Sequence, residues 1–410
     1  MARYALSTFA RTKPPGFAFA SAFRRMNKHF RRSSPAQDVR MRKVLTVFGT
    51  RPEAIKMAPV VRALKAAEGI EAVVCVTGQH RQMLDQMLGF FGVAADRDLD
   101  IMRPDQSLEG LTAAALQALG PALQEIRPDW VLVQGDTTTA MAAALAAYYR
   151  QIKVAHVEAG LRTGNKYAPF PEEVNRKIIG AIADLHFAPT ETARGALLAE
   201  GHRDDTILVT GNTGIDALMW TRGEIRAGRV GPPPGVEALI AGKRLVLVTA
   251  HRRENFDAGL AEICLALKAL AERFEDIVAI LPVHPNPNVK GPIEGLLTGV
   301  RGVHLIAPVD YGPFVWLLDR ASLVLTDSGG IQEEATALGK PMLVMREVTE
   351  RPEALAAGNA LLVGAHRDAI VEHAASVLSD EAVRLAMSTP SDVFGDGRAA
   401  ARIAAALQDR

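Results

Sequence analysis

Four carboxylates and two of the three arginines in one stretch of the chain, between residues 134 and 176, have types and positions that suit chemistry. These six residues are Asp136, Glu158, Glu172, Glu173, Arg162 and Arg176. They fall at the ends of predicted strands or in the loops that follow, and in an open parallel α/β sheet those ends face the ligand crevice. Burying so many charges is costly unless they pair or act on a substrate. The stretch therefore predicts an active site.

A phosphate pocket is predicted in the loop GTRPEAIK, residues 49–56, which joins the first strand to its helix. Glycine permits a close backbone approach, Pro52 presets the first helical turn, and a helix N-terminus favours an anion. Arg51 and Lys56 add positive charge. The alternative is a tight turn with a solvated arginine. The loop is neither a GxGxxG fingerprint nor a Walker A loop, so NAD and ATP are weak candidates.

A second strand–turn–helix segment, LTDSGGIQEE at residues 325–334, suits a diphosphate. Ser328, Gly329 and Gly330 present a hydroxyl and free backbone N–H groups at a helix start. Two acids follow one turn later. We expect one of Glu333 and Glu334 to reach ribose hydroxyls and the other to lie on a solvated face.

Two histidines follow predicted strands, in TAHRREN (residues 249–255) and PVHPNPN (residues 282–288). His251 can donate to a phosphate, although a histidine in such a place is more often a structural hydrogen-bonding group. His284 lies in a proline-rich turn. The sequence has no HExxH motif and no His/Cys cluster, so metal ligation is not expected.

Two further loops offer contacts for a nucleotide. Phe314, in YGPF at residues 311–314, presents an aromatic face on which a base can stack, with a core aromatic as the alternative. Arg351 directly precedes a helix that starts with proline, which again suits an anion.

The elements that must position these residues alternate between strand and helix from residue 42 onward. Strands are predicted at 43–49, 72–77, 129–134, 154–157, 185–188 and 207–210, then at 244–249, 276–283, 303–306, 323–326, 342–345 and 360–363. Such βαβ units predict an α/β fold with two Rossmann-like domains facing a cleft. The stretch 231–235 is the clearest linker, and a last helix at 397–407 is expected to cross back to the first domain. The predicted domain ranges are 1–40, 41–210, 211–388 and 389–410.

Composition narrows the function classes, since 410 residues are enough for two domains with large cores. Residues 1–40 hold nine Lys/Arg and one acid, and are interpreted as a disordered basic extension or a mis-assigned start. The remaining chain has 38 basic and 45 acidic residues, which argues against nucleic-acid binding. Cys75 and Cys264 lie in apolar runs and are expected to be reduced core residues of a cytoplasmic protein. No apolar run approaches the ~20 residues of a membrane span.

Taken in order, the motifs resemble those of the non-hydrolysing UDP-N-acetylglucosamine 2-epimerase family, from residue 41 to about residue 403. The resemblance is carried by VFGTRPEAIKMAP (47–59), TGQHRQMLDQM (77–87), QGDTTTAMAA (134–143), HVEAGLRTGNKYAPFPEEVNR (156–176), TGNTGIDAL (210–218), TAHRREN (249–255), LTDSGGIQEEA (325–335), TERPEA (349–354) and FGDGRAAARI (394–403).

This resemblance implies a glycosyltransferase-B-like fold and a homodimer. It implies reversible conversion of UDP-N-acetylglucosamine to UDP-N-acetylmannosamine for cell-surface polysaccharide synthesis, without NAD or a required metal. It assigns the chemistry to Asp136, Glu158 and Glu172, and makes Lys56 a further site residue.

The resemblance also assigns the nucleotide contacts. Arg51 and Ser328, with its neighbours in the SGG turn, fall on the diphosphate. Arg351 falls on a phosphate, and His251 lies beside the diphosphate, where we group it with the catalytic residues.

For the nucleoside, the resemblance places Phe314 near uracil and Glu334 on the ribose. Val309 departs from the family pattern, in which a polar residue is expected, and this puts one uracil or ribose contact in doubt. Some family members bind a second, activating substrate molecule, and the positions here that match that site are Gln79, Gln82 and His284.

The sugar chemistry fits such a set of residues. The C2 proton is not α to a carbonyl, so the route is loss of UDP from C1 with removal of the C2 proton, which gives a glucal. Re-addition of UDP after protonation on the other face inverts C2. Three rivals remain: a hydrolysing epimerase, which a fused kinase domain would mark, a glycosyltransferase of the same fold, and an inactive UDP-sugar sensor.

Overall fold

The computed structural model describes residues 41–78, 81–103, 106–252, 255–256 and 258–410, without the side chains of residues 81 and 82. The predicted basic extension at residues 1–40 therefore lies outside the described residues. Among the described helices, none is long and apolar enough to cross a membrane.

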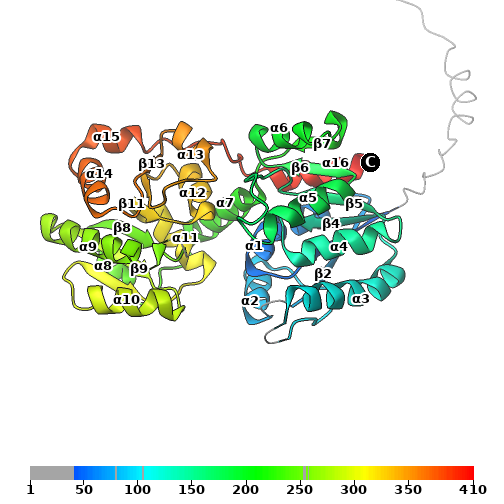
Figure 1. Cartoon of the computed structure of the whole chain (residues 1–410), viewed down its shortest axis with the longest axis horizontal. Coiled ribbons are helices and arrows are strands. Elements are labelled where there is room, and N and C mark those ends of the chain that lie inside the picture. Colours follow the sequence, from blue (N-terminus) through cyan, green and yellow to red (C-terminus); the bar gives the residue numbers. More distant parts are fainter. Residues whose placement is uncertain (1–40, 79–80, 104–105, 253–254, 257) are drawn as a thin grey trace, which may run out of the picture. The chain divides into compact units, whose positions relative to one another are not determined.

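The first half of the described chain folds into a parallel sheet with helices between its strands (Figure 1). Its strands are β1 (Arg42–Phe48), β2 (Ile70–Val76), β3 (Arg97–Asp98), β4 (Trp130–Gln134), β5 (Lys153–Val157), β6 (Leu185–Ala188) and β7 (Ile207–Val209). The helices are α1 (Arg51–Ala66), α2 (Arg81–Phe91), α3 (Leu108–Ile126), α4 (Thr138–Tyr148), α5 (Glu172–Ile182) and α6 (Glu191–Ala199), followed by a 3-10 turn, η1 (Asp204–Thr206).

The second half repeats this alternation in a second parallel sheet. Its strands are β8 (Arg244–Thr249), β9 (Ile277–Pro282), β10 (Val303–Ile306), β11 (Ala321–Thr326), β12 (Met342–Val344) and β13 (Ala360–Leu362). The helices are α8 (Val236–Ile240), α9 (Ala258–Arg273), α10 (Pro287–Leu297), α11 (Tyr311–Arg320), α12 (Gly329–Ala337), α13 (Pro352–Ala356), α14 (Arg367–Ser379) and α15 (Glu381–Ala386).

Both sheets have the strand order of a doubly wound fold. The orders are β3-β2-β1-β4-β5-β6-β7 and β10-β9-β8-β11-β12-β13. The direction of strand addition reverses between β1 and β4 in the first sheet and between β8 and β11 in the second. Ligands bind at such reversal points, outside the carboxyl ends of the strands. The predicted α/β class with two Rossmann-like sheets is confirmed.

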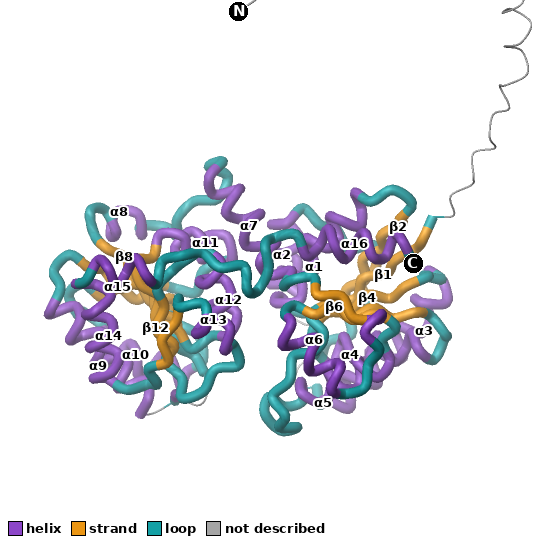
Figure 2. Tube along the Cα trace, turned by 90° about the horizontal axis from the view of Figure 1, so that it is seen from above, coloured by secondary structure: helices purple, strands orange, loops and turns teal. Residues whose placement is uncertain are grey.

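Each sheet is buried on both faces, which explains why its strands are continuous apolar runs. In β1, Val44 and Phe48 pack on the side of α1 and α2, whereas Leu45 and Val47 pack on the side of α3 and α4. Figure 2 shows α1, α2 and α16 (Ala399–Asp409) on one side of this sheet and α3, α4 and α5 on the other. The sheet therefore presents only its strand-end loops to a ligand.

Two segments join the halves. The first is α7 (Thr213–Arg226), whose buried Ile215 and Leu218 belong to a core cluster that contains residues of both sheets. The second leads into α16, which packs on α1 of the first half and confirms the predicted return of the last helix. Asp216 of α7 accepts the backbone N–H groups of Ala399 and Ala400 at 3.2 and 2.9 Å, which caps α16.

The stretch 231–235, predicted as the clearest linker, lies between α7 and α8. The chain leaves the first sheet earlier, after β7, and α7 itself contacts helices of both halves. The domain ranges given above stay predictions.

Candidate active site

Four loops that carry predicted site residues lie at the two reversal points. The loop after β1 leads to Arg51, the loop after β4 to Asp136, the loop after β8 to His251 and the loop after β11 to Ser328. Three of them run directly into α1, α4 and α12, so free N–H groups of helix starts face the same region as the charged side chains.

Glu53, which was not among the predicted site residues, ties the two loops of the first sheet together. Its Oε2 accepts from the backbone N–H of Gly49 at 3.1 Å and of Thr50 at 2.8 Å. Its Oε1 accepts from the Thr137 hydroxyl at 2.8 Å, and Thr137 is the N-cap of α4. Burial raises the pKa of Glu53, and these hydrogen bonds oppose the rise. The T-x-x-E pattern of a capping box was the sequence signal for this residue.

A cavity of 490 Å³ brings predicted residues together beside these loops. The predicted residues that line it are Lys56, Asp136, Glu158, Glu172 and Arg351. Arg351 comes from the second half and the other four from the first, so the two halves share this cavity.

Glu158 is the most constrained carboxylate of the cavity. Its Oε1 lies 2.5 Å from Lys56 Nζ, and its Oε2 accepts from the side-chain amide of Gln134. Glu158 is a non-glycine residue with a φ of 63°, a backbone conformation that costs energy and often occurs at functional sites. Burial alone would raise the pKa of Glu158, but Lys56, Arg351 and Arg176 outweigh burial and lower it.

Lys56 shows the reverse balance. Burial opposes its charged form, yet Glu158 and Glu333 outweigh burial, so the pKa of Lys56 is raised. The pair is therefore an ammonium and a carboxylate at neutral pH, and Glu158 is ready to accept a proton rather than to donate one.

Asp136 is held by the start of α5. Arg176 donates its Nε to Asp136 Oδ2 at 2.7 Å, and Asn175 donates to the Asp136 backbone carbonyl at 2.9 Å. Glu173 has a structural role, because its carboxylate accepts from the backbone N–H groups of Thr163 and Gly164 and pairs with Arg176. Glu173 thus anchors the loop after β5.

Glu172 has one buried carboxylate oxygen, Oε2, without a hydrogen-bond partner among the described residues. It lines the 490 Å³ cavity at the first residue of α5. A buried oxygen with no partner is costly in the free protein, and a bound ligand can supply the missing donor.

The start of α12 forms the anion-binding part of the site. Ser328 is the N-cap residue, its side chain makes no capping hydrogen bond, and Gly329 and Gly330 begin the helix. A Cβ at Gly329 would lie 3.8 Å from the Cζ and Nη2 atoms of Arg351, so the guanidinium lies against the helix start. The backbone N–H groups at the start of α12 and the Arg351 guanidinium can therefore contact the same anion.

The prediction for Glu333 and Glu334 is half wrong, because neither acid lies on a solvated face. Glu333 is 4% exposed and pairs with Arg351 Nε at 2.5 Å. Glu334 accepts from the Tyr311 hydroxyl at 3.0 Å. Burial, partly offset by the Tyr311 hydrogen bond, raises the pKa of Glu334 to about 7.

His251 is held by Asp327, a fully buried residue that was not predicted as part of the site. The Asp327 carboxylate accepts the backbone N–H of His251 at 2.8 Å, and its Oδ1 lies 3.4 Å from His251 Nδ1. Burial lowers the pKa of His251, which Asp327 partly counteracts. The imidazole of His284 stacks on that of His251, with ring centroids 5.7 Å apart.

Other predicted residues take separate places. Arg51 donates to the backbone carbonyl of Val309 at 3.5 Å, which links the first half to the second. Phe314 is half-buried on α11 and packs against the core. Gln79 and the side chain of Gln82 lie outside the described residues.

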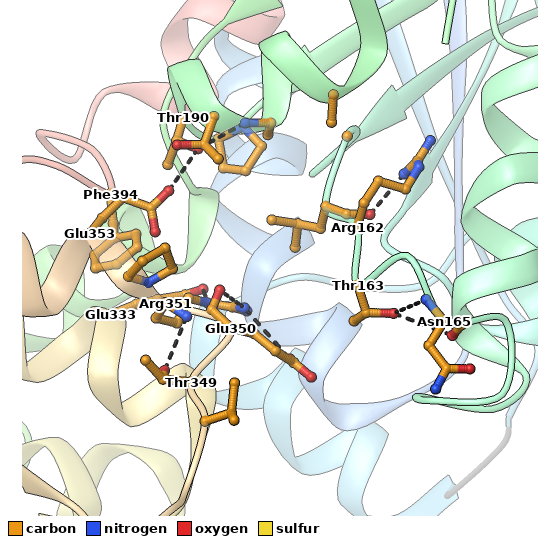
Figure 3. Close-up of a pocket in the computed structure, with 18 of the residues that line it drawn as sticks. Arg162, Thr163, Asn165, Thr190, Glu333, Thr349, Glu350, Arg351, Glu353 and Phe394 are labelled. Atoms are coloured by element: carbon orange, nitrogen blue, oxygen red, sulfur yellow. Dashed lines mark hydrogen bonds and ion pairs between the residues drawn. The ribbon is translucent and has the colours of Figure 1, made fainter. Parts of the chain in front are cut away.

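A second cavity, of 660 Å³, also has Arg351 in its lining (Figure 3). One wall is the segment from Thr349 to Glu353, and another is the loop after β5 with Arg162, Thr163 and Asn165. Arg162 makes a two-point contact with Glu200 at 2.8 and 2.7 Å, so this arginine anchors its loop and does not reach the clustered carboxylates.

Two doubly wound sheets that contribute charged strand-end loops to one region define a two-domain α/β enzyme of the glycosyltransferase-B type. The family model for UDP-N-acetylglucosamine 2-epimerase matches residues 62–408. The UDP-N-acetylglucosamine 2-epimerase of Escherichia coli strain K12 is 52% identical over 370 residues, which are 90% of this chain and 98% of that protein. The chain therefore belongs to the UDP-N-acetylglucosamine 2-epimerase family.

Solved structures of relatives agree. The UDP-GlcNAc 2-epimerase from Neisseria meningitidis bound to UDP-GlcNAc is 45% identical, with a TM-score of 0.82 over 90% of this chain and 100% of that one. The UDP-GlcNAc 2-epimerase from Methanocaldococcus jannaschii in complex with UDP-GlcNAc and UDP is 32% identical, with a TM-score of 0.75 over 90% and 100% of the two chains.

Proposed function

We propose that this chain interconverts UDP-N-acetylglucosamine and UDP-N-acetylmannosamine by eliminating UDP and adding it back. The observation that carries the proposal is the 490 Å³ cavity, in which Lys56, Asp136, Glu158 and Glu172 meet beside Arg351. Relatives with known structures bind UDP-GlcNAc, which supports the choice of substrate.

The reaction needs one proton and one leaving group to move. The bond between C1 and the UDP oxygen breaks, and its electron pair leaves with UDP. The C2 proton passes to a carboxylate as the C1=C2 double bond of the glucal forms. A proton then returns to C2 from the opposite face, and the UDP oxygen attacks C1 again.

The surroundings of each carboxylate indicate whether it removes the C2 proton or returns one. Glu158 is ionised because of Lys56, which suits the group that removes the C2 proton. Glu172, whose Oε2 has no hydrogen-bond partner among the described residues, supplies the proton on the other face, and Asp136, ion-paired with Arg176, lines the same cavity.

Positive charge must stabilise the departing diphosphate. Arg51, Arg351 and the start of α12 supply it, with Ser328, Gly329 and Gly330 as the backbone cradle. His251, whose pKa is lowered by burial, contributes a hydrogen bond rather than a charge. Glu334 accepts the ribose hydroxyls, and Phe314 packs against uracil.

The active form is a homodimer. Exposed apolar side chains gather on α5, where Val174 and Ile178 are one turn apart, and at the end of α4, where Tyr148 and Tyr149 are 61% and 65% exposed. The face of α4 and α5 fits a second copy of the chain. Cys75 and Cys264 are free and buried, as suits the reducing cytoplasm where sugar nucleotides are made.

Product analysis tests this function. Incubation with UDP-N-acetylglucosamine should give UDP-N-acetylmannosamine, resolved by proton NMR, with no added NAD. Free N-acetylmannosamine as the product would indicate the hydrolysing reaction instead. If UDP-N-acetylglucosamine stays unchanged alone and is consumed only when an acceptor sugar is added, the protein is a glycosyltransferase.

A further inference from the structure

Glu333 is a buried acid next to the proposed diphosphate site. Its negative charge would repel a bound diphosphate, so its presence there needs another explanation. It lies on α12, one turn after the start of the helix, and is 4% exposed. Both of its oxygens are engaged: Oε1 accepts from Arg351 Nε at 2.5 Å, and Oε2 accepts from Asn212 Nδ2 at 2.8 Å. Figure 3 shows Glu333 against Arg351 at the edge of the second cavity.

Asn212 stands where the chain first crosses between the halves. It is the N-cap of α7, and its Oδ1 accepts from Gly214 N at 2.8 Å. Its own backbone N–H donates to the carbonyl of Phe394, in the segment of the return crossing, at 2.7 Å. The two crossings touch closely, because a Cβ at Gly211 would lie 3.0 Å from the Cα of Gly395. Through Asn212, Glu333 is tied to both crossings.

Two of the three guanidinium nitrogens of Arg351 donate hydrogen bonds to other described residues. Its Nε is held by Glu333, and its Nη1 donates to the backbone carbonyl of Glu350 at 3.1 Å. Its Nη2 lies at the start of α12, beside Gly329. Arg351 also lines the cavity that contains Lys56 and Glu158. The orientation of its guanidinium is therefore set by Glu333 on one side and leaves Nη2 for a ligand.

We propose that Glu333 is a positioning residue, which fixes the Arg351 guanidinium at the start of α12 and ties it to the two chain crossings. This inference rests on the proposed role of Arg351 in holding the UDP diphosphate. A flexible arginine loses side-chain entropy when it binds, whereas one that is already held binds an anion at lower cost.

Charge and geometry predict opposite results for Glu333→Gln, which makes the test sharp. Removing a negative charge beside a diphosphate site should tighten UDP binding if Glu333 acts only through its charge. The amide, however, offers one acceptor where two donors, Arg351 Nε and Asn212 Nδ2, must be satisfied. If Glu333 positions Arg351, we expect UDP to bind about tenfold more weakly, as for the loss of a hydrogen bond to a charged group.

The experiment measures the dissociation constant of UDP by calorimetry for the full chain and its variants, each checked for its melting temperature. Glu333→Asp keeps the charge but is too short to reach both donors, so it should also weaken UDP binding. Glu350→Gln, which removes an exposed acid 3.8 Å from Arg351 Nη1, is the matched control and should change affinity less than about twofold. In steady-state kinetics, Glu333→Gln should raise KM for the sugar nucleotide more than it lowers kcat.

A double-mutant cycle with Arg351→Met completes the test. If Glu333 acts through Arg351, then Glu333→Gln adds nothing in the Arg351→Met background. Unchanged or tighter UDP binding by Glu333→Gln, or additive effects in the cycle, would overturn the inference while leaving the role of Arg351 intact. Unchanged binding by Arg351→Met alone would overturn that role, and the inference with it.

Discussion

Glu158 is a carboxylate on which burial and nearby cations act in opposite directions. Its side chain is 6% exposed, and burial alone would favour its protonated form by raising its pKa. Lys56 at 2.5 Å, with Arg351 and Arg176 further away, reverses that preference. The acid–base role assigned to Glu158 therefore depends on the ammonium group of Lys56.

Replacing Lys56 should move the pH dependence of the reaction. A group that must be ionised loses activity as pH falls through its pKa, and in the wild type the pKa of Glu158 lies below its usual range. In Lys56→Met the pKa of Glu158 should rise, because the neighbouring positive charge is lost. We therefore expect the acid limb of the kcat/KM profile to move up by ~1–3 pH units. Lys56→Arg keeps the charge and should leave the limb in place. Identical limbs in both variants would contradict the assignment.

Glu334 gives a second pH dependence, of nucleoside binding. The pKa of Glu334 is raised by burial to about 7. In the proposed ribose contact, the carboxylate is the form that accepts hydrogen bonds from both hydroxyls. As pH falls below 7 the protonated fraction grows, so the affinity for uridine should weaken by up to about tenfold per pH unit. Uridine is the useful probe because it lacks the phosphates that His251 would contact. In Glu334→Gln the affinity should not vary between pH 5.5 and 8, and the same slope in both proteins would exclude Glu334 as its source.

At the level of elements, the sequence predicted most of the positions correctly. The apolar runs and their turns gave strands 185–188, 244–249 and 303–306 with the bounds found for β6, β8 and β10. The loops after β1, β4, β8 and β11 were identified because parallel strands end at one edge. β3 was missed, because two residues, Arg97 and Asp98, carry no apolar pattern.

The supporting acids were the harder problem. Glu53 and Asp327 both lie in the predicted motifs. The capping-box pattern T-x-x-E marks Glu53 in the sequence, but no sequence pattern shows that Asp327 accepts the backbone N–H of His251. Glu333 does not lie on a solvated face as one of the two expectations had it, because it pairs with Arg351 and Asn212, which are 18 and 121 residues away in the sequence. Local pattern predicts which loops meet, whereas the pairing of buried charges depends on tertiary contacts.

The bond between Glu53 and Thr137 should matter for both stability and rate. Thr137→Val removes the N-cap hydrogen bond of α4 and the hydroxyl that donates to Glu53. The free energy of unfolding should therefore fall by ~1–3 kcal/mol. Because Asp136 precedes Thr137, kcat should fall as well. Thr137→Ser keeps the hydroxyl and should stay near the wild type. Denaturant unfolding and turnover of the two variants make the comparison, and equal loss in both would show that the hydroxyl is not the cause.

The molecule as a whole depends on two chain crossings that the sequence indicated only in part. The return of the last helix was predicted, and α16 packs on α1. The role of α7 was not, because an amphipathic helix does not show which two surfaces it joins. Ile215 and Leu218 are fully buried in a core that includes residues of both sheets, so the halves share apolar packing next to the site.

The proposed dimer face can be broken with one charge. Ile178 is 36% exposed on α5, one turn from Val174. Burying a glutamate between two apolar helices is unfavourable, so Ile178→Glu should dissociate a wild-type dimer into monomers at micromolar concentration. Leu385→Glu, at an exposed aliphatic residue of α15, is the control and should remain dimeric. Light scattering coupled to size exclusion gives the mass, and a wild-type monomer would refute the dimer.

Exchange of the C2 hydrogen with solvent is the measurement that tests the central claim most directly. In heavy water, UDP-N-acetylglucosamine incubated with the protein should yield UDP-N-acetylmannosamine with deuterium at C2, because the carboxylates of the cavity exchange their proton with solvent. Asp136→Asn and Glu158→Gln should each abolish the deuterium signal while the protein still binds UDP. Epimerised product that keeps hydrogen at C2, or near-normal exchange in both variants, would contradict the account.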